Sequence, residues 1–147
     1  MDIVDSAKRS RMMAGIRGRD TKPEITLRRE LHARGFRFRL QNGALPGRPD
    51  IVLPRWRAAI QVHGCFWHRH SGCHFSTVPA SNAEFWMAKF TANVERDARK
   101  LDELMRLGWR VAVVWECGLR RKGLNTVVDP LVEWLRSDTP FCELPMP

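Results

Sequence analysis

The pattern of apolar and polar positions predicts a chain of helices and short strands. Apolar residues recur at helical spacing in four stretches, and they alternate or run together in four shorter ones. The predicted helices cover residues 6–18, 21–35, 83–107 and 126–136, and the predicted strands cover residues 36–40, 50–53, 57–64 and 109–116. A long loop precedes the third helix, and residues 138–147 are expected to form an irregular tail. This order predicts a single α/β domain over residues 1–147, with helices on both sides of a short mixed sheet.

Local signals set the ends of the predicted helices. Thr21 followed by Glu24 matches a capping box at the start of the second helix, and Gly35 is placed to end it. Asn82 is expected to cap the long helix, and Gly108 to end it. Glu24 either acts only as a cap or also points inward toward the sheet edge, since it shares a helix face with two leucines.

Composition and charge favour a nucleic-acid partner. The net charge is +9 and the isoelectric point is about 10.4, and residues 1–40 hold 11 Lys and Arg against 5 Asp and Glu. A basic domain favours a polyanion such as DNA, while RNA, a membrane surface and a merely solubilising charge are the alternatives. The chain has no apolar run of about 18 residues and no apolar segment typical of a secretory signal near its start. We therefore expect a cytoplasmic, nucleoid-associated monomer with no membrane partner.

The stretch from Val62 to Cys73, VHGCFWHRHSGC, predicts a metal site. Within it Cys65, His70 and Cys73 follow the spacing C-x4-H-x2-C, and Cys117 ends a predicted strand further along the chain. Three thiolates and one imidazole are a usual ligand set for structural Zn²⁺, and they argue against Mg²⁺ or Ca²⁺ at that site. Ordinary buried cysteines are the alternative, most of all for Cys117, and His74 is a rival to His70. Cys142 in the tail is expected to take no part.

Two aspartates are candidates for catalysis. Asp50 directly follows a proline at the start of a strand, where a carboxylate could hold Mg²⁺ against a scissile phosphate. If the next strand pairs with it in antiparallel fashion, the main-chain carbonyl of Val62 could be a second oxygen ligand. Asp97 interrupts an apolar helix face marked by Phe90 and Leu101, so it needs a histidine or arginine partner. The alternatives are a turn aspartate for Asp50 and a structural salt bridge for Asp97.

The aromatic residues suggest a wedge for DNA. Phe66 and Trp67 follow a metal ligand in a loop, and Trp86 starts the long helix beside Phe85. Rigid aromatic rings on a basic protein can insert between base pairs and unstack them. We expect Phe66, Trp67 and Trp86 to serve in this way, and Phe85 to pack in the core.

Four strings in this order give the chain a resemblance to one family. They are LPGRPD, VHGCFWHRH, EFWMAKFTANVERD and GWRVAVVWEC. They closely resemble the very short patch repair (Vsr) mismatch endonucleases over nearly the whole chain, from about Arg9 to Trp134. The resemblance implies a restriction-endonuclease-like fold and a Mg²⁺-dependent enzyme. It also implies that one DNA strand is nicked on the 5′ side of the thymine in a T·G mismatch, which arises when 5-methylcytosine deaminates.

The resemblance further implies a role for each matching residue. Asp50 would bind the Mg²⁺, His68 would be the general base, Asp97 would orient an imidazole, and His63 and Glu24 would complete the active site. Cys65, His70, Cys73 and Cys117 would hold zinc, and Phe66, Trp67 and Trp86 would be the intercalating wedge. The basic N-terminal helix within residues 1–20 would clasp the DNA, with Lys8, Arg9, Arg11, Arg17 and Arg19 against its backbone. The expected partners are double-stranded DNA with a T·G mismatch, a cognate cytosine methyltransferase and general mismatch-repair proteins.

Two departures bear on this resemblance. The usual nuclease pattern of the fold has an acidic residue and a lysine on the second strand, but here that strand reads AAIQVHG, which suits a histidine-based site instead. Some family members have threonine where this chain has Val62, which is harmless if the main-chain carbonyl makes the contact. The rival hypothesis is a non-catalytic, zinc-stabilised DNA-binding module, which would need neither Asp50 nor His68.

Overall fold

A five-stranded mixed sheet forms the centre of the computed structural model, which describes residues 20–120 and 123–146. The strands are β1 (Arg39–Leu40), β2 (Ile51–Leu53), β3 (Ala58–His63), β4 (Arg110–Trp115) and β5 (Phe141–Leu144), and they lie in this order across the sheet. β1 pairs with β2, and β2 with β3, in antiparallel fashion, whereas β3, β4 and β5 run parallel to one another. The predicted helix over residues 6–18, and with it Lys8, Arg9, Arg11, Arg17 and Arg19, lies outside the described residues.

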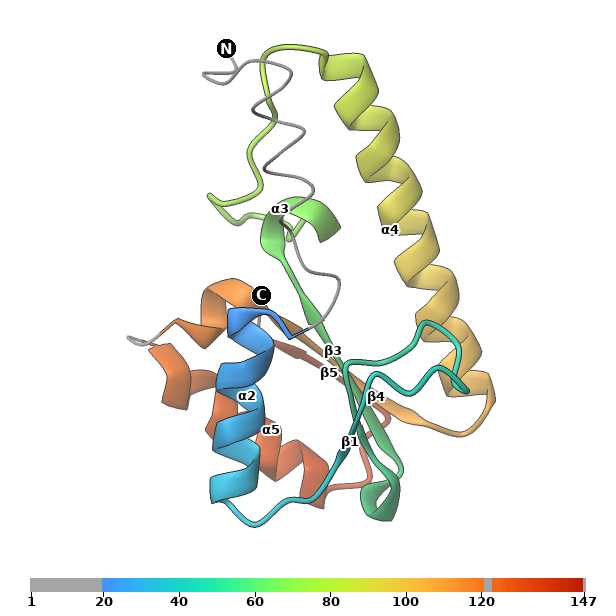
Figure 1. The fold of residues 1–147 in the computed structure, drawn as a ribbon, viewed down its shortest axis with the longest axis vertical. Coiled ribbons are helices and arrows are strands. Elements are labelled where there is room, and N and C mark those ends of the chain that lie inside the picture. The colour runs from blue at the N-terminus through green and yellow to red at the C-terminus, as the bar shows by residue number, and fades with distance from the viewer. Residues whose placement is uncertain (1–19, 121–122, 147) are drawn as a thin grey trace.

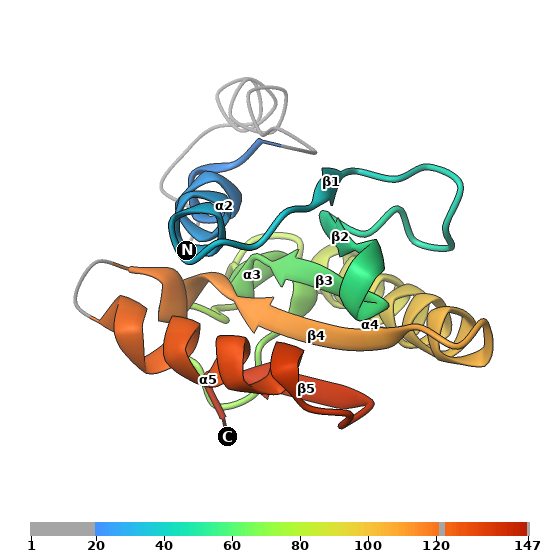
Figure 2. The same cartoon turned by 90° about the horizontal axis from the view of Figure 1, so that it is seen from below.

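Helices cover both faces of the sheet, which confirms the predicted α/β architecture (Figures 1 and 2). They are α2 (Lys22–Ala33), α3 (Cys65–His68), α4 (Ala83–Arg106) and α5 (Leu124–Arg136), with short 3-10 turns at Pro54–Trp56 and Glu116–Leu119. Leucines of α2 and valines and leucines of α5 pack on one face of the sheet, against residues such as Ile60 and Val114. On the other face, Leu104 of α4 packs against Ala59 and Val111. Burial of these apolar side chains is the main favourable term for this layered arrangement.

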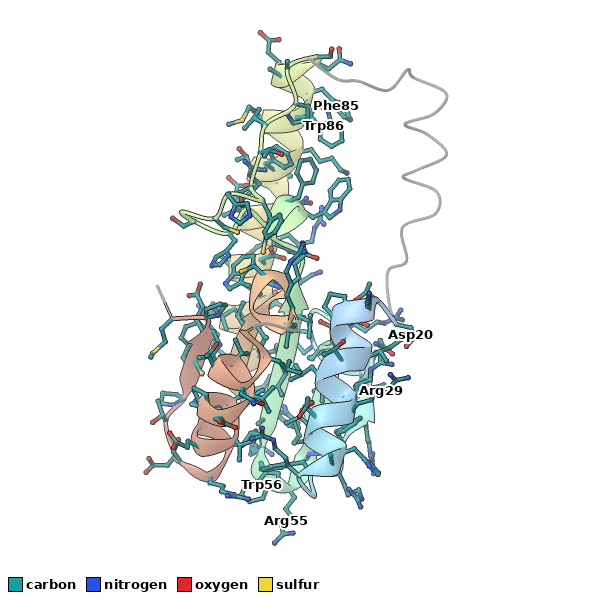
Figure 3. The ribbon with its side chains drawn as sticks, turned by 90° about the vertical axis from the view of Figure 1, so that its left-hand side faces the viewer. Asp20, Arg29, Arg55, Trp56, Phe85 and Trp86 are labelled. Atoms are coloured by element: carbon teal, nitrogen blue, oxygen red, sulfur yellow. The ribbon has the colours of Figure 1, made fainter. Side chains whose placement is uncertain are left out.

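The long helix α4 extends beyond the sheet, on the side where α3 lies (Figure 1). Its first half runs beside α3 and the loop that follows α3 (Figure 1). Phe85 and Trp86 lie at this end of the molecule, while Arg55 and Trp56 lie at the opposite end (Figure 3). In the described part of the chain, no helix is both long enough and apolar enough to cross a membrane.

Several local predictions hold and others were wrong. The capping box is confirmed, since Thr21 Oγ1 accepts from the Glu24 N–H and Glu24 Oε2 accepts from the Thr21 N–H. Asn82 does not cap α4 with its side chain, because its backbone is left-handed with φ of 56°. Of the predicted strand over residues 36–40 only the last two residues pair, because Phe36 turns into the core instead.

The irregular tail expected for residues 138–147 is the most consequential correction. Phe141–Leu144 pairs with β4 in parallel, as the edge strand of the sheet. Pro140 and Pro145 flank this short segment. In the sequence, the whole of α5 lies between it and its pairing partner β4. A parallel pairing of this kind leaves little local signal, because a crossover helix separates the two strands. Cys142 lies in this strand, packed against the core and apart from the other cysteines.

Candidate active site and metal centre

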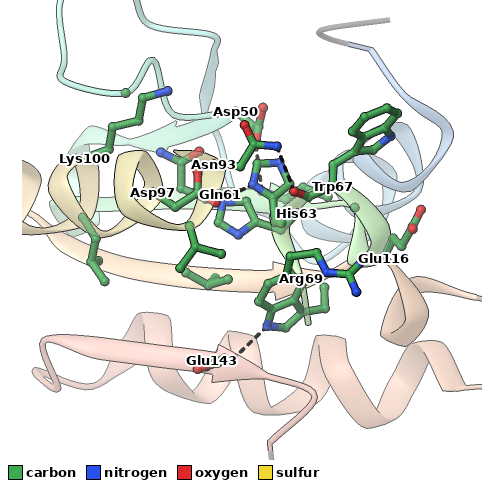
Figure 4. A pocket seen from close by; sticks show the side chains of 18 of the residues that line it. Asp50, Gln61, His63, Trp67, Arg69, Asn93, Asp97, Lys100, Glu116 and Glu143 are labelled. Carbon is green, nitrogen blue, oxygen red and sulfur yellow. Dashed lines mark hydrogen bonds and ion pairs between the residues drawn. The ribbon is translucent and has the colours of Figure 1, made fainter. Parts of the chain in front are cut away.

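A cleft of about 970 Å³ gathers most of the predicted catalytic residues (Figure 4). It lies where the C-terminal end of β3 meets α2, α3, α4 and the loop before β2. The predicted residues among those lining it are Glu24, Asp50, Val62, His63, Phe66, Trp67, His68 and Asp97. The cleft therefore brings together carboxylates, imidazoles and two of the three aromatic rings assigned to the wedge. The four predicted zinc ligands are not among its lining residues.

A strand pairing that the sequence left open holds Asp50 in place. The antiparallel pairing of β2 with β3 brings Asp50 beside the end of β3, where the Val62 N–H donates to Asp50 Oδ2 at 2.7 Å. Burial raises the pKa of Asp50 to about 7 in spite of this hydrogen bond, and the neighbouring Glu24 carboxylate adds to the rise. A cation at this position would relieve the cost of two adjacent carboxylates with little access to water. The Val62 contact seen here is made by its N–H, and the role of its carbonyl stays a prediction.

Glu24 serves both purposes that the sequence left open. It closes the capping box of α2, and its side chain is buried, with only 3% of the residue exposed. Arg28 donates to Glu24 Oε2 at 3.2 Å, so the buried charge has a partner. The first turn of α2 thereby presents a carboxylate to the cleft beside Asp50.

His68 and Asp97 form a hydrogen-bonded pair. His68 Nδ1 lies 2.6 Å from Asp97 Oδ2, which confirms that the aspartate on the apolar face of α4 is paired with a histidine. His68 ends the short helix α3, within the stretch that the sequence predicted to be a loop. Burial by itself would raise the pKa of Asp97, but the hydrogen bond from His68 and nearby positive groups hold it below its usual value. An acceptor at Nδ1 fixes the proton there and leaves Nε2 with a free lone pair. This arrangement can take a proton from a water molecule.

His63 is a second, neutral imidazole stacked on the first. Its ring lies parallel to that of His68, with 4.0 Å between centroids, and makes a T-shaped contact with the ring of Trp115. Burial, and then the closeness of His68, lower the pKa of His63 to about 3. His63 is therefore uncharged at neutral pH. The donor atoms of His63, His68 and Asp97 all lie within 4.8 Å of one another, so this group could also touch a bound cation.

The predicted zinc ligands converge on one point. The side-chain donor atoms of Cys65, His70, Cys73 and Cys117 all lie within 4.8 Å of one another. His70 Nδ1 is 3.6 Å from the Cys65 sulfur and 3.5 Å from the Cys117 sulfur. Burial and the neighbouring thiols raise the pKa of Cys65 to about 12, so the cluster needs a cation before its thiols can ionise. Three thiols and an imidazole at these distances suit a four-coordinate zinc ion.

Geometry distinguishes His70 from His74. The ring of His70 is stacked on Trp115 with 4.4 Å between centroids, which holds its Nδ1 toward the thiols. His74 is exposed and lies against Phe75 instead. The structure therefore brings His70, and not His74, to the cysteine cluster.

The aromatic residues form one cluster whose exposure differs from the prediction. The Phe66 ring meets Trp67, Trp86 and Phe90 edge-on, at centroid distances of 5.0, 5.8 and 5.2 Å. Trp86 is 4% exposed, whereas Phe85 is 59% exposed, so the expectation that Phe85 packs in the core was wrong. The two residues are neighbours on a helix, about 100° apart, so their side chains point in different directions, and only Trp86 is buried in the cluster.

Four residues that support the site were missed from the sequence. Arg69 donates to three main-chain carbonyls of the loop, and its guanidinium lies 4.0 Å from the centre of the Phe90 ring. Asn93 donates to the Trp67 carbonyl at 3.1 Å, and its place one helical turn before Asp97 was a usable signal. Glu116 accepts from the Cys65 N–H, and Glu143 accepts from the Trp115 indole. No sequence signal pointed to Glu143, which lies in the unpredicted β5.

Comparisons with known proteins agree with this geometry. A family model described as DNA mismatch endonuclease Vsr matches residues 1–74. The chain is 46% identical over 137 residues to the DNA mismatch endonuclease Vsr of Escherichia coli (strain K12), covering 91% of this chain and 87% of that protein. It is 44% identical over 134 residues to the type II nicking enzyme V.XorIIP of Xanthomonas oryzae pv. oryzae, covering 88% and 98%. It is 43% identical over 123 residues to the type II nicking enzyme V.NmeAIP of Neisseria meningitidis, covering 84% and 87%. By its motifs, its cleft and these relatives, the chain belongs to the Vsr family of DNA mismatch endonucleases.

Proposed function

We propose that this protein is a Mg²⁺-dependent endonuclease that nicks one strand of double-stranded DNA on the 5′ side of the thymine in a T·G mismatch. Its relatives include proteins named as a mismatch endonuclease and as nicking enzymes, which supports single-strand cleavage at a mispair. The mixed sheet with helices on both faces supports a restriction-endonuclease-like fold. The enzyme would act on the product of 5-methylcytosine deamination, in the same pathway as a cytosine methyltransferase.

The observation that carries this proposal is a carboxylate site and a histidine–aspartate pair in one cleft. Hydrolysis of a phosphodiester needs a base for the attacking water and a means of stabilising charge on the phosphate. His68, oriented by Asp97 at 2.6 Å, is the base. Asp50 and Glu24 line the same cleft as this pair and supply the anionic site. The alternative of a non-catalytic DNA-binding module gives no reason for such an arrangement.

The chain's own residues prepare the water for attack. His68 accepts the proton at Nε2, while Asp97 holds the Nδ1 proton and stabilises the imidazolium that forms. His63 stays neutral, so it supports the His68 ring by stacking without adding a second positive charge beside it. Trp115, in T-shaped contact with His63, supports the stack.

The residues present fit a bound Mg²⁺. Hard oxygen ligands suit this ion, and Asp50, assisted by Glu24 and the Val62 carbonyl, would hold it. The raised pKa of Asp50 fits the same interpretation, because a carboxyl that is costly to ionise by itself gains most from a nearby cation. When bound, the ion would act as a Lewis acid on the scissile phosphate and stabilise its developing negative charge.

Recognition of the mispair is assigned to the aromatic cluster, and stability of the loop to zinc. Phe66 and Trp67 line the cleft, and Trp86 packs behind them as the third member of the wedge. Insertion of Trp86 itself would require the cluster to open, so Trp67 is the better test of the wedge. One structural Zn²⁺ held by the ligand cluster would anchor the loop that carries these rings.

A nicking assay tests the proposal. Duplexes of one sequence with each possible mispair, each strand labelled in turn, are incubated with the protein in Mg²⁺ or in EDTA. We expect a single nick 5′ of the thymine of the T·G duplex in Mg²⁺, none in EDTA and none in the paired duplex. Asp50→Asn should abolish nicking yet keep mismatch binding, because affinity comes mainly from phosphate contacts and the wedge. Asp102→Asn makes the same chemical change at an exposed position of α4 outside the cleft, and is the control.

Four outcomes would contradict it. Cleavage of both strands, or nicking of paired and mispaired duplexes at equal rates, would refute the mismatch-specific nicking activity. Full activity of Asp50→Asn, or in EDTA, would refute the metal-bound carboxylate.

A further inference from the structure

Lys100 projects into the active-site cleft from α4 and has no role in the chemistry assigned so far. It lies three residues after Asp97, so the two side chains share one face of the helix. It lines the same cleft as Asp50, His63 and Asp97 (Figure 4). The residue is half-buried, in contrast to its neighbour Arg99, which is exposed and does not line the cleft.

The loop before β2 packs against the aliphatic stem of Lys100. A Cβ added at Gly47 would lie 2.8 Å from the Cβ and 2.9 Å from the Cδ of Lys100, closer than atoms can approach. Gly47 also has φ of +74°, which disfavours any side chain there. The loop backbone thus rests directly on the lysine stem. This contact limits the rotamers of Lys100 and holds its ammonium group at the cleft.

The ammonium group is free to bind an incoming anion. Within residues 20–120 and 123–146, Lys100 makes no ion pair and donates no hydrogen bond, although an ammonium has three donors. Arg48, Arg69 and Lys89 also line the cleft. Of these, Arg69 donates to three main-chain carbonyls and lies over the Phe90 ring. The guanidinium of Arg69 is therefore already engaged, while the charge of Lys100 is not.

The carboxylates of the cleft would repel a phosphate, and the positive charge of Lys100 would oppose this repulsion. Glu24, Asp50 and Asp97 line a cleft that must admit a polyanion, and strand β3 reads AAIQVH, without a lysine or arginine. Burial is the main cause of the lowered pKa of His63, and the hydrogen bond from His68 is the main cause that lowers the pKa of Asp97; the positive charge of Lys100 adds a smaller effect to both, so its field reaches the groups that carry out the reaction. A phosphate brought beside them would meet this ammonium as a partner that opposes the repulsion from the carboxylates.

We propose that Lys100 binds a phosphate oxygen of the nicked strand inside the cleft, and so positions that strand against Asp50 and His68. The inference rests on the proposed function, in that it takes DNA to be the substrate of this cleft. It adds a phosphate-binding residue on α4 to the carboxylates and imidazoles that are assigned to the reaction.

The test uses variants that separate charge from packing. Lys100→Met keeps the stem that packs on Gly47 but removes the ammonium, and Lys100→Gln is a second neutral variant. Lys100→Arg keeps the charge, and Arg99→Met removes one charge from the neighbouring exposed position as the matched control. Thermal unfolding of each variant establishes that it folds like the wild type.

Binding to a mismatched duplex is measured over a range of salt concentrations in EDTA, so that no strand is cut. We expect Lys100→Met to reduce the slope of log K against log [salt] by about one unit, as the loss of one phosphate contact should. Single-turnover nicking in Mg²⁺ should fall roughly 10- to 100-fold, the range for a hydrogen bond to a charged group. Lys100→Arg should recover most of both losses, and Arg99→Met should show neither.

Duplexes with a single neutral methylphosphonate, moved along the nicked strand, identify the phosphate. The wild type should lose affinity at one position near the nick where Lys100→Met loses no more, because its contact there is already gone. Equal effects of Lys100→Met and Arg99→Met, or the same methylphosphonate profile in wild type and Lys100→Met, would overturn the proposal. If the wild type binds the mismatched duplex but never nicks it, the proposed function fails, while the salt slope and the methylphosphonate profile still decide the role of Lys100.

Discussion

Replacing the carboxylate of Asp97 by an amide should disable catalysis while leaving DNA binding intact. In the structure Asp97 Oδ2 lies 2.6 Å from His68 Nδ1. In Asp97→Asn the amide oxygen can accept a hydrogen bond from His68 Nδ1–H, but it carries no negative charge. Alternatively the amide NH₂ donates a hydrogen bond to Nδ1, and the imidazole proton then lies on Nε2. The first state no longer stabilises the imidazolium, and the second removes the lone pair that accepts the proton from water.

The expected loss follows from the role of a general base. Positioned acid–base catalysis contributes about 10²- to 10⁴-fold, so nicking should slow by that factor, equivalent to about 3–5 kcal/mol in the activation free energy. The free energy of unfolding should fall by a smaller amount, roughly 1–2 kcal/mol, since one charged hydrogen bond becomes a neutral one. Binding of the mismatched duplex should stay within a few-fold of the wild type, because Asp97 contributes no positive charge to phosphate contacts.

The assay is single-turnover nicking of a T·G duplex with enzyme in excess, at a temperature well below the unfolding transition of every variant. Asp102→Asn is the control, since it makes the same change at an exposed position of α4. Together with His68→Ala and the double variant that carries both changes, Asp97→Asn forms a double-mutant cycle. If the two residues act as one unit, the double variant should be about as slow as His68→Ala alone. A wild-type rate for Asp97→Asn, or losses that simply multiply in the double variant, would refute the paired mechanism.

Three further predictions concern zinc, the wedge and pH. Elemental analysis should find one zinc per chain. Cys73→Ser should lower both the zinc content and the melting temperature, whereas His74→Ala should leave the zinc content unchanged. Wild-type protein that contains no zinc when purified without chelators would contradict this. Trp67→Ala should weaken binding of mismatched DNA by about 5- to 100-fold, the value of roughly 1–3 kcal/mol of stacking, and of paired DNA much less; equal losses would make Trp67 only a packing residue. The pKa of His63 is about 3 in the folded state, below its ordinary value of 6.5. As pH falls below 6.5, the imidazole of the unfolded chain therefore takes up a proton that the folded protein does not bind, and the free energy of unfolding drops. Denaturant unfolding should therefore show that the wild type loses about 2 kcal/mol more than His63→Gln between pH 7 and 4.5. Parallel pH curves would contradict the buried neutral imidazole.

Local chemistry in the sequence determined much of the fold. The capping box of Thr21 with Glu24 depends only on neighbouring residues, so the start of α2 was predictable. Two short apolar runs predicted strands β2 and β3, whereas their antiparallel pairing was only a condition that the structure then met. The apolar stripe of α4 made Asp97 anomalous, because a carboxylate on a buried face requires a partner. The tight C-x4-H-x2-C spacing indicated a metal site before any fold was known.

Only the tertiary structure decided which of several equivalent residues is used. His70 and His74 both lie close to Cys73 in the sequence, but the Trp115 ring on which His70 stacks comes from a strand distant in the chain. Phe85 and Trp86 could each have faced the cluster, and the direction of α4 against α3 decided between them. Strand β5, with Glu143, exists because α5 returns the chain beside β4. The raised pKa of Asp50 and the free ammonium of Lys100 arise from packing between elements far apart in sequence, because burial and electrostatic fields depend on neighbours in space that a linear pattern does not contain.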